Sequence, residues 1–392
     1  MLRKNFFRGA LVLLAAAVPL TGCDDTWPEE TSAVYEFTEE ITLDNVARLL
    51  SSLPLGTAQV AEVFDAVSSS RGNGYDEEYL MRDLFASPGS GVGDAASPTK
   101  AASYSRPLRD MIAELVTESC RTKAGGAGRV QAFLDSLAAS SVQIYWPYSD
   151  DWDGKTLPLI TFDPGDDADI NIAYRIVEND STRVLERRYV DEITALDRPV
   201  WVINANTDAM YKTVEMLRRE NPGWGTGGGS LTKASDVRTL YLRSFQSKRQ
   251  YDSWFAGGSE FFVKCGAVED FTASTEAELQ LYSPTVTDFM VVIPRRDIRK
   301  VNEYNVVLVS EWTDQLESCA FMITEDDGGT QTSWKASATV KYNSKSYGFD
   351  MQIPLNTRDD IVWRGQLARR YIERYSGSVA HFGDVDLVLE LE

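Results

Sequence analysis

The sequence predicts a multidomain α+β protein, with a helical and small mixed β N-terminal half and an antiparallel β-sandwich at the C-terminus. Three observations lead to this prediction. Apolar residues recur at helical spacing over 41–140, short β-rich runs occupy 141–220, and polar and apolar residues alternate within 231–392. The 392 residues suffice for two or three domains of roughly 100 to 200 residues each.

The helical region begins with an apolar stripe. Val46, Leu49 and Leu50 fall on one face of a segment that Asp44 can cap, and a Pro-Leu-Gly run at 54–56 ends it. The same spacing then continues along the chain. It predicts further helical runs at 60–67, 77–85, 107–120 and 129–139.

After residue 141 the period of the apolar residues changes to that of strands. Short runs rich in β-branched and aromatic residues, bounded by Asp, Gly and Pro, predict strands at 142–146, 157–162, 170–177 and 199–203. A run rich in Pro and Gly at 221–230 then predicts a linker between domains.

The clearest alternation in the chain lies beyond this linker. Polar and apolar residues alternate over 334–342 and over 349–355, on either side of a turn at 343–346. This pattern predicts a hairpin with one solvent-exposed face and one buried face. One helix, capped by Asp359 and Asp360, is expected over 361–372. Further strands are expected near 237–245, 260–268, 276–282, 287–293, 304–312, 318–324 and 384–391.

This many short strands in so few residues is typical of a sandwich. The region resembles calcium-dependent membrane-binding (C2-type) sandwiches in its strand count and in its acidic loop at 325–329. Immunoglobulin-like and jelly-roll sandwiches would give the same pattern, so the subtype stays open.

The N-terminus has the features of a secretory signal peptide. Three basic residues precede an apolar run over 10–20, which is too short to span a bilayer. The run ends in Leu20-Thr21-Gly22-Cys23, which resembles the lipobox of bacterial lipoproteins. The resemblance implies cleavage before Cys23 and lipid on its thiol, which anchors the protein to a bilayer without a spanning helix. The alternative is a plain secretory peptide that happens to contain a cysteine.

The residues after Cys23 bear on location. The acidic pair Asp24 and Asp25 is similar to signals that export lipoproteins to the cell surface in some Gram-negative lineages, which favours an outer-membrane, surface-exposed protein. Elsewhere an Asp at this place retains the lipoprotein at the inner membrane, so the periplasmic face is the alternative. Residues 23–40 are acidic with little periodicity and predict a tether.

The chain is strongly acidic, with 39 basic and 59 acidic residues and a formal net charge of −20. Residues 1–22 hold three basic and no acidic side chains, so their removal leaves −23. A field of this sign repels phosphate backbones, and no basic stripe reverses it locally. Nucleic acid is therefore not expected as a partner, whereas divalent cations and cationic ligands remain open.

The sequence offers few residues for a nucleophilic catalytic site and too few histidines for a metal site built from several of them. His381 is the single histidine, so it would have to serve any Ser-His-Asp or Cys-His site. Hydrolases that dispense with histidine use a Ser-x-x-Lys motif, and two tetrads, at 97–100 and 230–233, fit it. Both lie in predicted loops rich in Gly, Pro and Ser, and the other motifs of such hydrolases do not accompany them. Besides Cys23, the cysteines are Cys120, Cys265 and Cys319, read as small buried apolar side chains, although a Cys265–Cys319 disulfide is conceivable.

Two clusters of carboxylates in loops are the candidate metal sites. Calcium takes six to eight oxygen ligands from irregular loops, so calcium is the only cofactor for which the sequence offers a physical reason. Solvated turns are the alternative for both clusters. The candidate ligands are Asp163, Asp166, Asp167 and Asp169 in the first cluster, and Glu325, Asp326 and Asp327 in the second.

The expected function is a non-catalytic binding or interaction module on a membrane-anchored lipoprotein. Its expected partners are the bilayer, through acylated Cys23, and an unknown protein or glycan ligand. Aromatic and acidic residues over 144–152 can stack on sugars or pack beneath a loop. The alternative is a carboxylate-dependent, glycosidase-like hydrolase, which a cleft with paired carboxylates and aromatics would favour. Segments 142–163, 199–206 and 224–229 resemble uncharacterised secreted lipoproteins, which implies no activity.

We predict that Cys23→Ser releases the protein from membranes, because no other apolar run approaches the length of a spanning helix. Membrane sedimentation followed by immunoblotting measures the outcome, with the unmodified chain as the control. Sedimentation of the variant with the membrane fraction would contradict the anchor.

Overall fold

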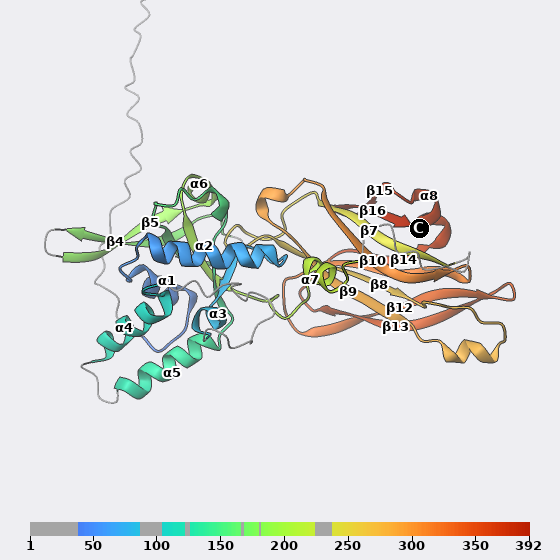
Figure 1. Ribbon diagram of the computed structural model, residues 1–392, viewed down its shortest axis with the longest axis horizontal. Coiled ribbons are helices and arrows are strands. Elements are labelled where there is room, and N and C mark those ends of the chain that lie inside the picture. The colour runs from blue at the N-terminus through green and yellow to red at the C-terminus, as the bar shows by residue number, and fades with distance from the viewer. Residues whose placement is uncertain (1–37, 87–103, 122–125, 166–167, 180–181, 224–236) are drawn as a thin grey trace, which may run out of the picture.

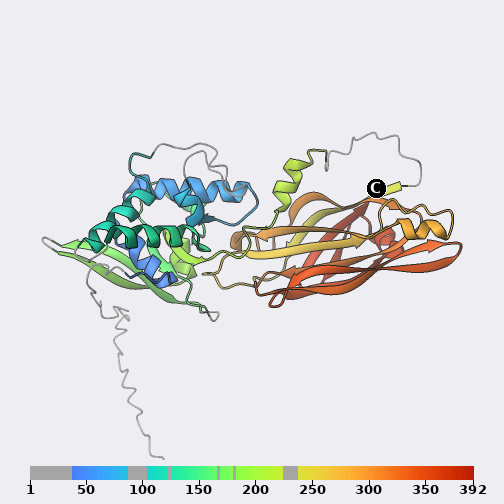
Figure 2. The same ribbon diagram turned by 90° about the horizontal axis from the view of Figure 1, so that it is seen from below.

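The structure is a computed structural model. It describes residues 38–86, 104–121, 126–165, 168–179, 182–223 and 237–392. These residues form two lobes that lie end to end along the long axis (Figure 1; Figure 2). We call the described residues of 38–205 the first lobe, those of 214–392 the second lobe, and residues 206–213 the crossing segment. Among the described residues, no helix is long and apolar enough to cross a membrane.

The first lobe combines helices with one six-stranded sheet of order β1-β2-β6-β3-β4-β5, in which only β3 and β6 pair in parallel. Its described helices are α1 (Leu43–Ser51), α2 (Thr57–Gly72), α3 (Met81–Phe85), α4 (Leu108–Cys120), α5 (Gly126–Ala138), α6 (Glu192–Asp197) and the 3-10 turn η1 (Ser149–Asp151). The strands are β1 (Glu78–Leu80), β2 (Val142–Tyr145), β3 (Leu159–Phe162), β4 (Asn171–Asn179), β5 (Thr182–Val190) and β6 (Val200–Ala205).

The central strand β6 is buried on both faces. Trp201 and Ile203 point into the core formed with α1, α2, α4 and α5. Val200 and Val202, which alternate with them, belong to a different cluster on the opposite face. These four helices therefore cover one face of the sheet, and Ala195 of α6 packs with residues of other elements on the opposite face.

Polar side chains cap several helices of this region. The Thr42 hydroxyl, rather than Asp44, caps α1 by accepting a hydrogen bond from the backbone of Asn45. Asp191 caps α6 in the same way, by accepting from the backbone of Thr194. Each cap satisfies a backbone N–H that has no partner within the helix.

The second lobe holds two antiparallel sheets, one of order β10-β7-β16-β15 and one of order β13-β12-β11-β8-β9, with β14 paired to β11. Its strands are β7 (Val237–Ser247), β8 (Ser259–Ala267), β9 (Thr285–Ile293), β10 (Asn302–Thr313), β11 (Leu316–Glu325), β12 (Gln331–Tyr342), β13 (Lys345–Asn356), β14 (Asp360–Ala368), β15 (Ser378–Phe382) and β16 (Val385–Leu391). Its helices are α7 (Val214–Glu220), α8 (Arg369–Tyr375) and the 3-10 turns η2 (Ala277–Leu281) and η3 (Arg295–Asp297).

The expected hairpin is present as β12 and β13. Asn343 and Ser344 connect the strands with φ values of 47° and 64°, the left-handed conformation that two-residue hairpin turns require. Strands of both sheets contribute to one hydrophobic core, for example Phe245 of β7, Phe261 of β8 and Leu387 of β16. The α+β class and the strand-rich C-terminal region are therefore confirmed.

The two lobes are joined by the loop between β7 and β8. Trp254 and Phe255 of this loop are buried against Val200 and Val202, on the face of the first sheet opposite α1, α2, α4 and α5. The Asn204 side-chain amide also donates hydrogen bonds to the carbonyls of Phe255 and Ala256, at 3.0 and 2.7 Å. Aromatic burial and directed hydrogen bonds together fix the relative position of the lobes.

The cores do not follow the predicted boundaries in every respect. Residues of the regions 41–140 and 141–220 share one hydrophobic core, because the helices pack on the sheet. Val214 of α7 already belongs to the core of the second lobe, before the expected linker at 221–230. The Gly-rich part of that linker lies in 224–236, outside the described residues.

Three predicted elements are wrong, and long-range pairing explains two of them. In place of one helix over 77–85, β1 pairs with β2 before α3 begins. The segment expected to start a helix at residue 361 forms β14 against β11, and the helix begins only at Arg369. The strand expected at 276–282 is instead the 3-10 turn η2.

We predict that Phe255→Ala costs about 3–5 kcal/mol of unfolding free energy, because the ring is 0% exposed and its loss leaves a cavity between the lobes. Leu281→Ala is the control, since Leu281 is 79% exposed, and its effect should stay within about 0.5 kcal/mol. Denaturant titration measures both. Equal effects would mean that Phe255 does not dock the lobes.

Candidate functional site

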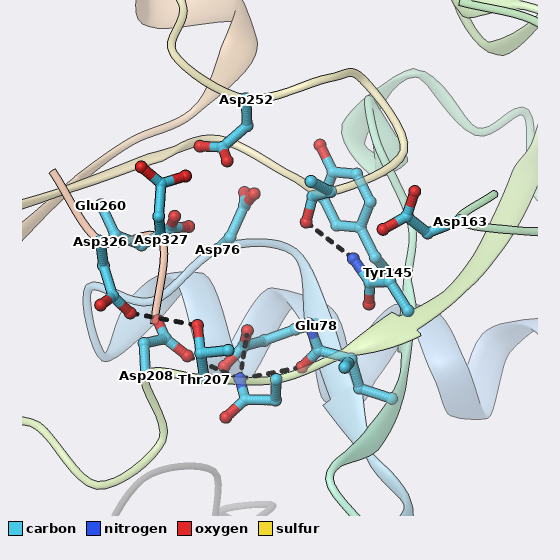
Figure 3. A pocket seen from close by; sticks show the side chains of 15 residues that line it. Asp76, Glu78, Tyr145, Asp163, Thr207, Asp208, Asp252, Glu260, Asp326 and Asp327 are labelled. Atoms are coloured by element: carbon cyan, nitrogen blue, oxygen red, sulfur yellow. Dashed lines mark hydrogen bonds between the residues drawn. The ribbon is translucent and has the colours of Figure 1, made fainter. Parts of the chain in front are cut away.

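A cleft of about 250 Å³ lies where the two lobes meet (Figure 3). Eight carboxylates line it, and none of its 15 described lining residues is a lysine, arginine or histidine. The lining residues are Asp76, Glu78, Gln143, Tyr145, Asp163, Asn204, Ala205, Asn206, Thr207, Asp208, Asp252, Ala256, Glu260, Asp326 and Asp327. This concentration of one sign of charge makes the cleft the candidate functional site.

The first-lobe wall is the sheet face opposite α1, α2, α4 and α5. Tyr145 pairs with Glu78 of β1, and Gln143 pairs with Asn204 of β6. Tyr145 shares its hydrophobic cluster with Val202, so side chains at alternate positions from these residues face the cleft. The alternation of strands therefore brings three polar side chains and one tyrosine to one surface.

Acidic residues from three segments of the second lobe form the other wall of the cleft. Asp252 lies in the docking loop next to Trp254, Glu260 lies on β8, and Asp326 and Asp327 follow β11. Asp326 is fixed in place, because its backbone N–H donates to the Glu260 carbonyl at 2.9 Å. The same docking that joins the lobes thus also positions the acidic loop after β11.

Asp76 and Asp326 accept hydrogen bonds from residues far away in the sequence. Asp76 accepts from the backbone N–H groups of Glu77 and Gly258, at 2.8 and 2.6 Å. Asp326 accepts from the Thr207 hydroxyl at 3.1 Å and from the Asn356 amide at 3.2 Å. The hydrogen bonds from Gly258, Thr207 and Asn356 join segments far apart in the sequence, so Asp76 and Asp326 have a structural role in the walls.

Asn206 shows that donors are scarce on the first-lobe wall. Its Nδ2 group lies 2.6–3.1 Å from acceptors on Glu78, Gln143 and Asp208. An amide NH₂ has two protons for these three acceptors. Asp208 Oδ2 and Asn204 Oδ1 are buried and accept no hydrogen bond from the described residues.

Three carboxylates at the other wall lie close together. Asp252, Glu325 and Asp327 each place one carboxylate oxygen within 4.8 Å of the others. Glu325 is 1% exposed and does not itself line the cleft, and its Oε1 accepts no hydrogen bond from the described residues. The Ca–O distance is about 2.3–2.6 Å, so oxygens that share one calcium ion lie within about 5 Å of one another. The spacing of these three carboxylates therefore suits one such ion.

Burial and mutual repulsion make these carboxylic acids weak. Burial, followed by repulsion from Asp326 and Asp76, raises the pKa of Asp208 to about 7. Burial likewise raises the pKa of Asp252 to about 7. Burial and repulsion from Asp252 raise the pKa of Glu325 well above its usual value. Charged carboxylates in this cleft therefore need a counterion.

The structure joins the two acidic clusters that the sequence presents separately. Asp163, Asp326 and Asp327 line the same cleft, and a carboxylate oxygen of Glu325 lies within 4.8 Å of one on Asp327. Asp169 is exposed, and its backbone carbonyl accepts a hydrogen bond from the Trp254 indole at 2.9 Å. Asp166, Asp167 and the lipidation candidate Cys23 lie outside the described residues.

Five acidic lining residues were not among the sequence candidates: Asp76, Glu78, Asp208, Asp252 and Glu260. The acidic run at 76–78 was a usable signal, but its helical interpretation hid it. Asp208 follows β6 closely, and polar residues at strand ends often line sites, so this position also had a signal. Nothing in the sequence pattern distinguishes Asp252 or Glu260 from other acids.

Other candidates from the sequence lie elsewhere. His381 is on β15 with its side chain 72% exposed, 2.5 Å from Asp386, and does not line the cleft. Cys120, Cys265 and Cys319 are buried free thiols. Trp146 of the aromatic segment is buried beside Trp152 and Trp201. Both Ser-x-x-Lys tetrads fall outside the described residues.

The cleft offers no platform for stacking a sugar. Tyr145 is the one aromatic residue among its described lining residues, and it is 1% exposed. Paired carboxylates without such a platform suit cation binding better than glycoside hydrolysis. No protein-family model and no curated protein sequence matches this chain.

We predict that the cation-free protein is less stable at pH 8 than at pH 5. Carboxyl groups whose folded pKa is raised stabilise the fold below their unfolded pKa of about 4, and this stability is lost as the pH rises through about 7. In EDTA, the melting temperature should therefore be lower at pH 8 than at pH 5 by about 5 °C or more.

Glu62→Gln is the control for this pH dependence. Burial raises the pKa of Glu62 to about 7 as well, but Glu62 lies on α2 and does not line the cleft. The melting temperature of this variant should therefore still decrease between pH 5 and pH 8 by most of the amount seen in the wild type. A melting temperature that rises steadily from pH 5 to pH 8 would contradict the assignment.

Proposed function

We propose that this protein is a lipid-anchored binding protein outside the cytoplasm, and that its interlobe cleft binds a divalent cation, with calcium preferred. The observation that carries the proposal is a set of buried carboxylate oxygens, at and beside the cleft, that accept no hydrogen bond from the described residues, while no described residue that lines the cleft is basic. Such oxygens are stable as anions only beside a cation, since burial of an unpaired charge is costly.

Calcium fits this site better than magnesium. Calcium accepts six to eight oxygens in irregular arrangements, whereas magnesium demands a near-ideal octahedron and keeps several of its waters. The walls of the cleft supply carboxylate, amide and hydroxyl oxygens from strands and loops of both lobes. Because these oxygens come from several strands and loops, their arrangement is irregular. An irregular arrangement favours calcium over magnesium.

The location follows from the N-terminus and from the charge. The lipobox resemblance at Cys23 supports anchoring through acyl chains, and Asp24 with Asp25 supports the outer-membrane surface over the periplasmic face. The net charge of −20 attracts cations to the cleft over a long range. A surface protein would meet calcium at the concentrations that extracellular modules bind, about 10⁻⁴ to 10⁻³ M.

We also infer that the two sheets of the second lobe stack as a β-sandwich. The support is their shared hydrophobic core, to which Leu240 and Leu242 of β7 and Val263 and Cys265 of β8 contribute. A C2-like and an immunoglobulin-like arrangement both remain open.

We predict that calcium raises the melting temperature and that magnesium at the same concentration does so far less. Binding to the native state alone stabilises it by RT ln(1 + [L]/Kd), about 2.7 kcal/mol at a hundredfold excess over Kd. For a protein of this size the shift is on the order of 5 °C. An unchanged melting curve at millimolar calcium would refute the proposal.

The double variant Asp252→Asn with Asp327→Asn localises the effect. It should melt at a higher temperature than the wild type in EDTA, because repulsion is relieved, and it should lose most of the calcium shift. The matched control is Asp110→Asn with Asp135→Asn, which removes two carboxylates from α4 and α5, outside the cleft. This control should keep the whole shift.

A further inference from the structure

A second pocket, of about 110 Å³, lies on the first lobe and shares no lining residue with the interlobe cleft. It is formed by the segment that joins β2 to β3 and by the end of α6 with the residues after it. Three aromatic side chains, three carboxylates and one guanidinium meet there. The lining residues are Trp146, Tyr148, Asp151, Trp152, Asp153, Thr156, Ala195, Leu196, Asp197, Arg198 and Pro199.

We propose that this pocket binds one neutral sugar unit of a glycan, with Trp152 and Tyr148 against the sugar ring and Asp197 and Arg198 on its hydroxyl groups. The inference goes beyond the proposed function, because it adds a ligand and a site that cation binding in the cleft does not need. Pockets for drug-sized ligands measure about 300–1,000 Å³, so this smaller pocket suits a single unit.

Trp152 is a half-buried ring that the protein holds in place. Its indole nitrogen donates to the Thr156 carbonyl at 3.0 Å. Its ring packs against Phe64 and Trp146, with both ring centroids 5.6 Å away. The face of an aromatic ring is electronegative, so it attracts the weakly positive C–H groups of a sugar ring. A fixed ring makes this contact without losing rotamer freedom on binding.

Tyr148 reaches the pocket through an unusual backbone conformation. Its φ is 61°, in the left-handed region that bulky residues rarely adopt. The buried Glu77 carboxylate holds this conformation, because it accepts from the backbone N–H groups of Tyr148 and Ser149, both at 3.0 Å. The Tyr148 hydroxyl donates to Glu192 at 2.7 Å, which fixes the ring as well. Strained residues that their surroundings hold in this way are common at binding sites.

The polar side chains of the pocket offer an acceptor and a donor. Asp197 is exposed. Arg198 donates from Nη2 to the Leu157 carbonyl at 3.0 Å, and it pairs with no carboxylate among the described residues. Burial, followed by repulsion from Arg175 and Arg188, lowers the pKa of the Arg198 guanidinium. A hydroxyl group both donates and accepts, so a carboxylate and a guanidinium that do not pair with each other suit a sugar.

The charges of the pocket argue against an ionic ligand. Arg296 lies 3.8 Å from Asp151, and two backbone N–H groups donate to Asp153 at 2.8 and 2.7 Å. The charges that remain are those of Asp197 and Arg198, one of each sign. Asp197 would repel an anion and Arg198 a cation, whereas a neutral polyhydroxyl ligand meets neither repulsion.

Affinity electrophoresis tests the inference with the purified protein in EDTA. Native gels are cast separately with dextran, mannan, galactomannan, xyloglucan and glycol chitin, and serum albumin is the non-binding reference. At least one polysaccharide should retard the protein relative to a gel without polysaccharide. Unchanged migration in every gel would overturn the inference and would leave cation binding in the cleft untouched.

Variants then locate the site, with Kd measured by tryptophan fluorescence for the polysaccharide that retards the protein. Trp152→Ala and Asp197→Ala should each weaken binding by about tenfold or more, since each removes a direct contact. Asp197 is exposed, so its variant tests the site without disturbing the core. Tyr375→Ala on α8 and Asp110→Ala on α4 are the controls, and both should keep the wild-type Kd. A wild-type Kd in Asp197→Ala, or in Trp152→Ala that circular dichroism shows to be folded, would overturn the assignment.

Discussion

The docking of Trp254 and Phe255 against the first sheet is the interaction on which the candidate site depends. These rings pack on the sheet face opposite α1, α2, α4 and α5, and the Asn204 side-chain amide donates to the adjacent carbonyls. The loop that carries them also carries Asp252, so the apolar contact and the acidic wall belong to one segment. Because protein interiors are close-packed, this docking fixes the distance between carboxylates of the two lobes.

The electrostatic consequence is a conflict between packing and charge. Apolar burial brings the lobes together, while carboxylates from both lobes repel one another across the cleft. Hydrogen bonds to Asp76 and Asp326 relieve only part of this repulsion. Protons can relieve the rest below neutral pH, and cations can relieve it above. Buried carboxylates that repel one another are common at functional sites, so their presence in this cleft supports a functional role for it.

Much of the fold could be predicted because local patterns agree with tertiary structure. The alternation over 334–355 matches β12 and β13, and the stripe near residue 60 matches α2. The failures occur where a partner strand decides the conformation. β14 is paired to β11 and β1 to β2, and in both segments the composition alone also fits a helix.

The site could be predicted only in part, for a related reason. The loops at 163–169 and 325–327 were identifiable because acids cluster there in sequence. Their meeting in one cleft depends on how two hydrophobic cores dock, which no local pattern reports. Glu260 illustrates the limit, since it is one acid in an apolar strand and its role comes from its neighbours across the cleft.

The measurement that tests the central claim most directly is a crystal structure with a calcium analogue whose anomalous scattering locates the ion. Crystals grown with terbium chloride in place of calcium should show anomalous density between the two walls, within ligand distance of Asp252 and Asp208. An ordered cleft that contains only water, with terbium bound elsewhere on the acidic surface, would contradict the claim that the lobes together form a cation site.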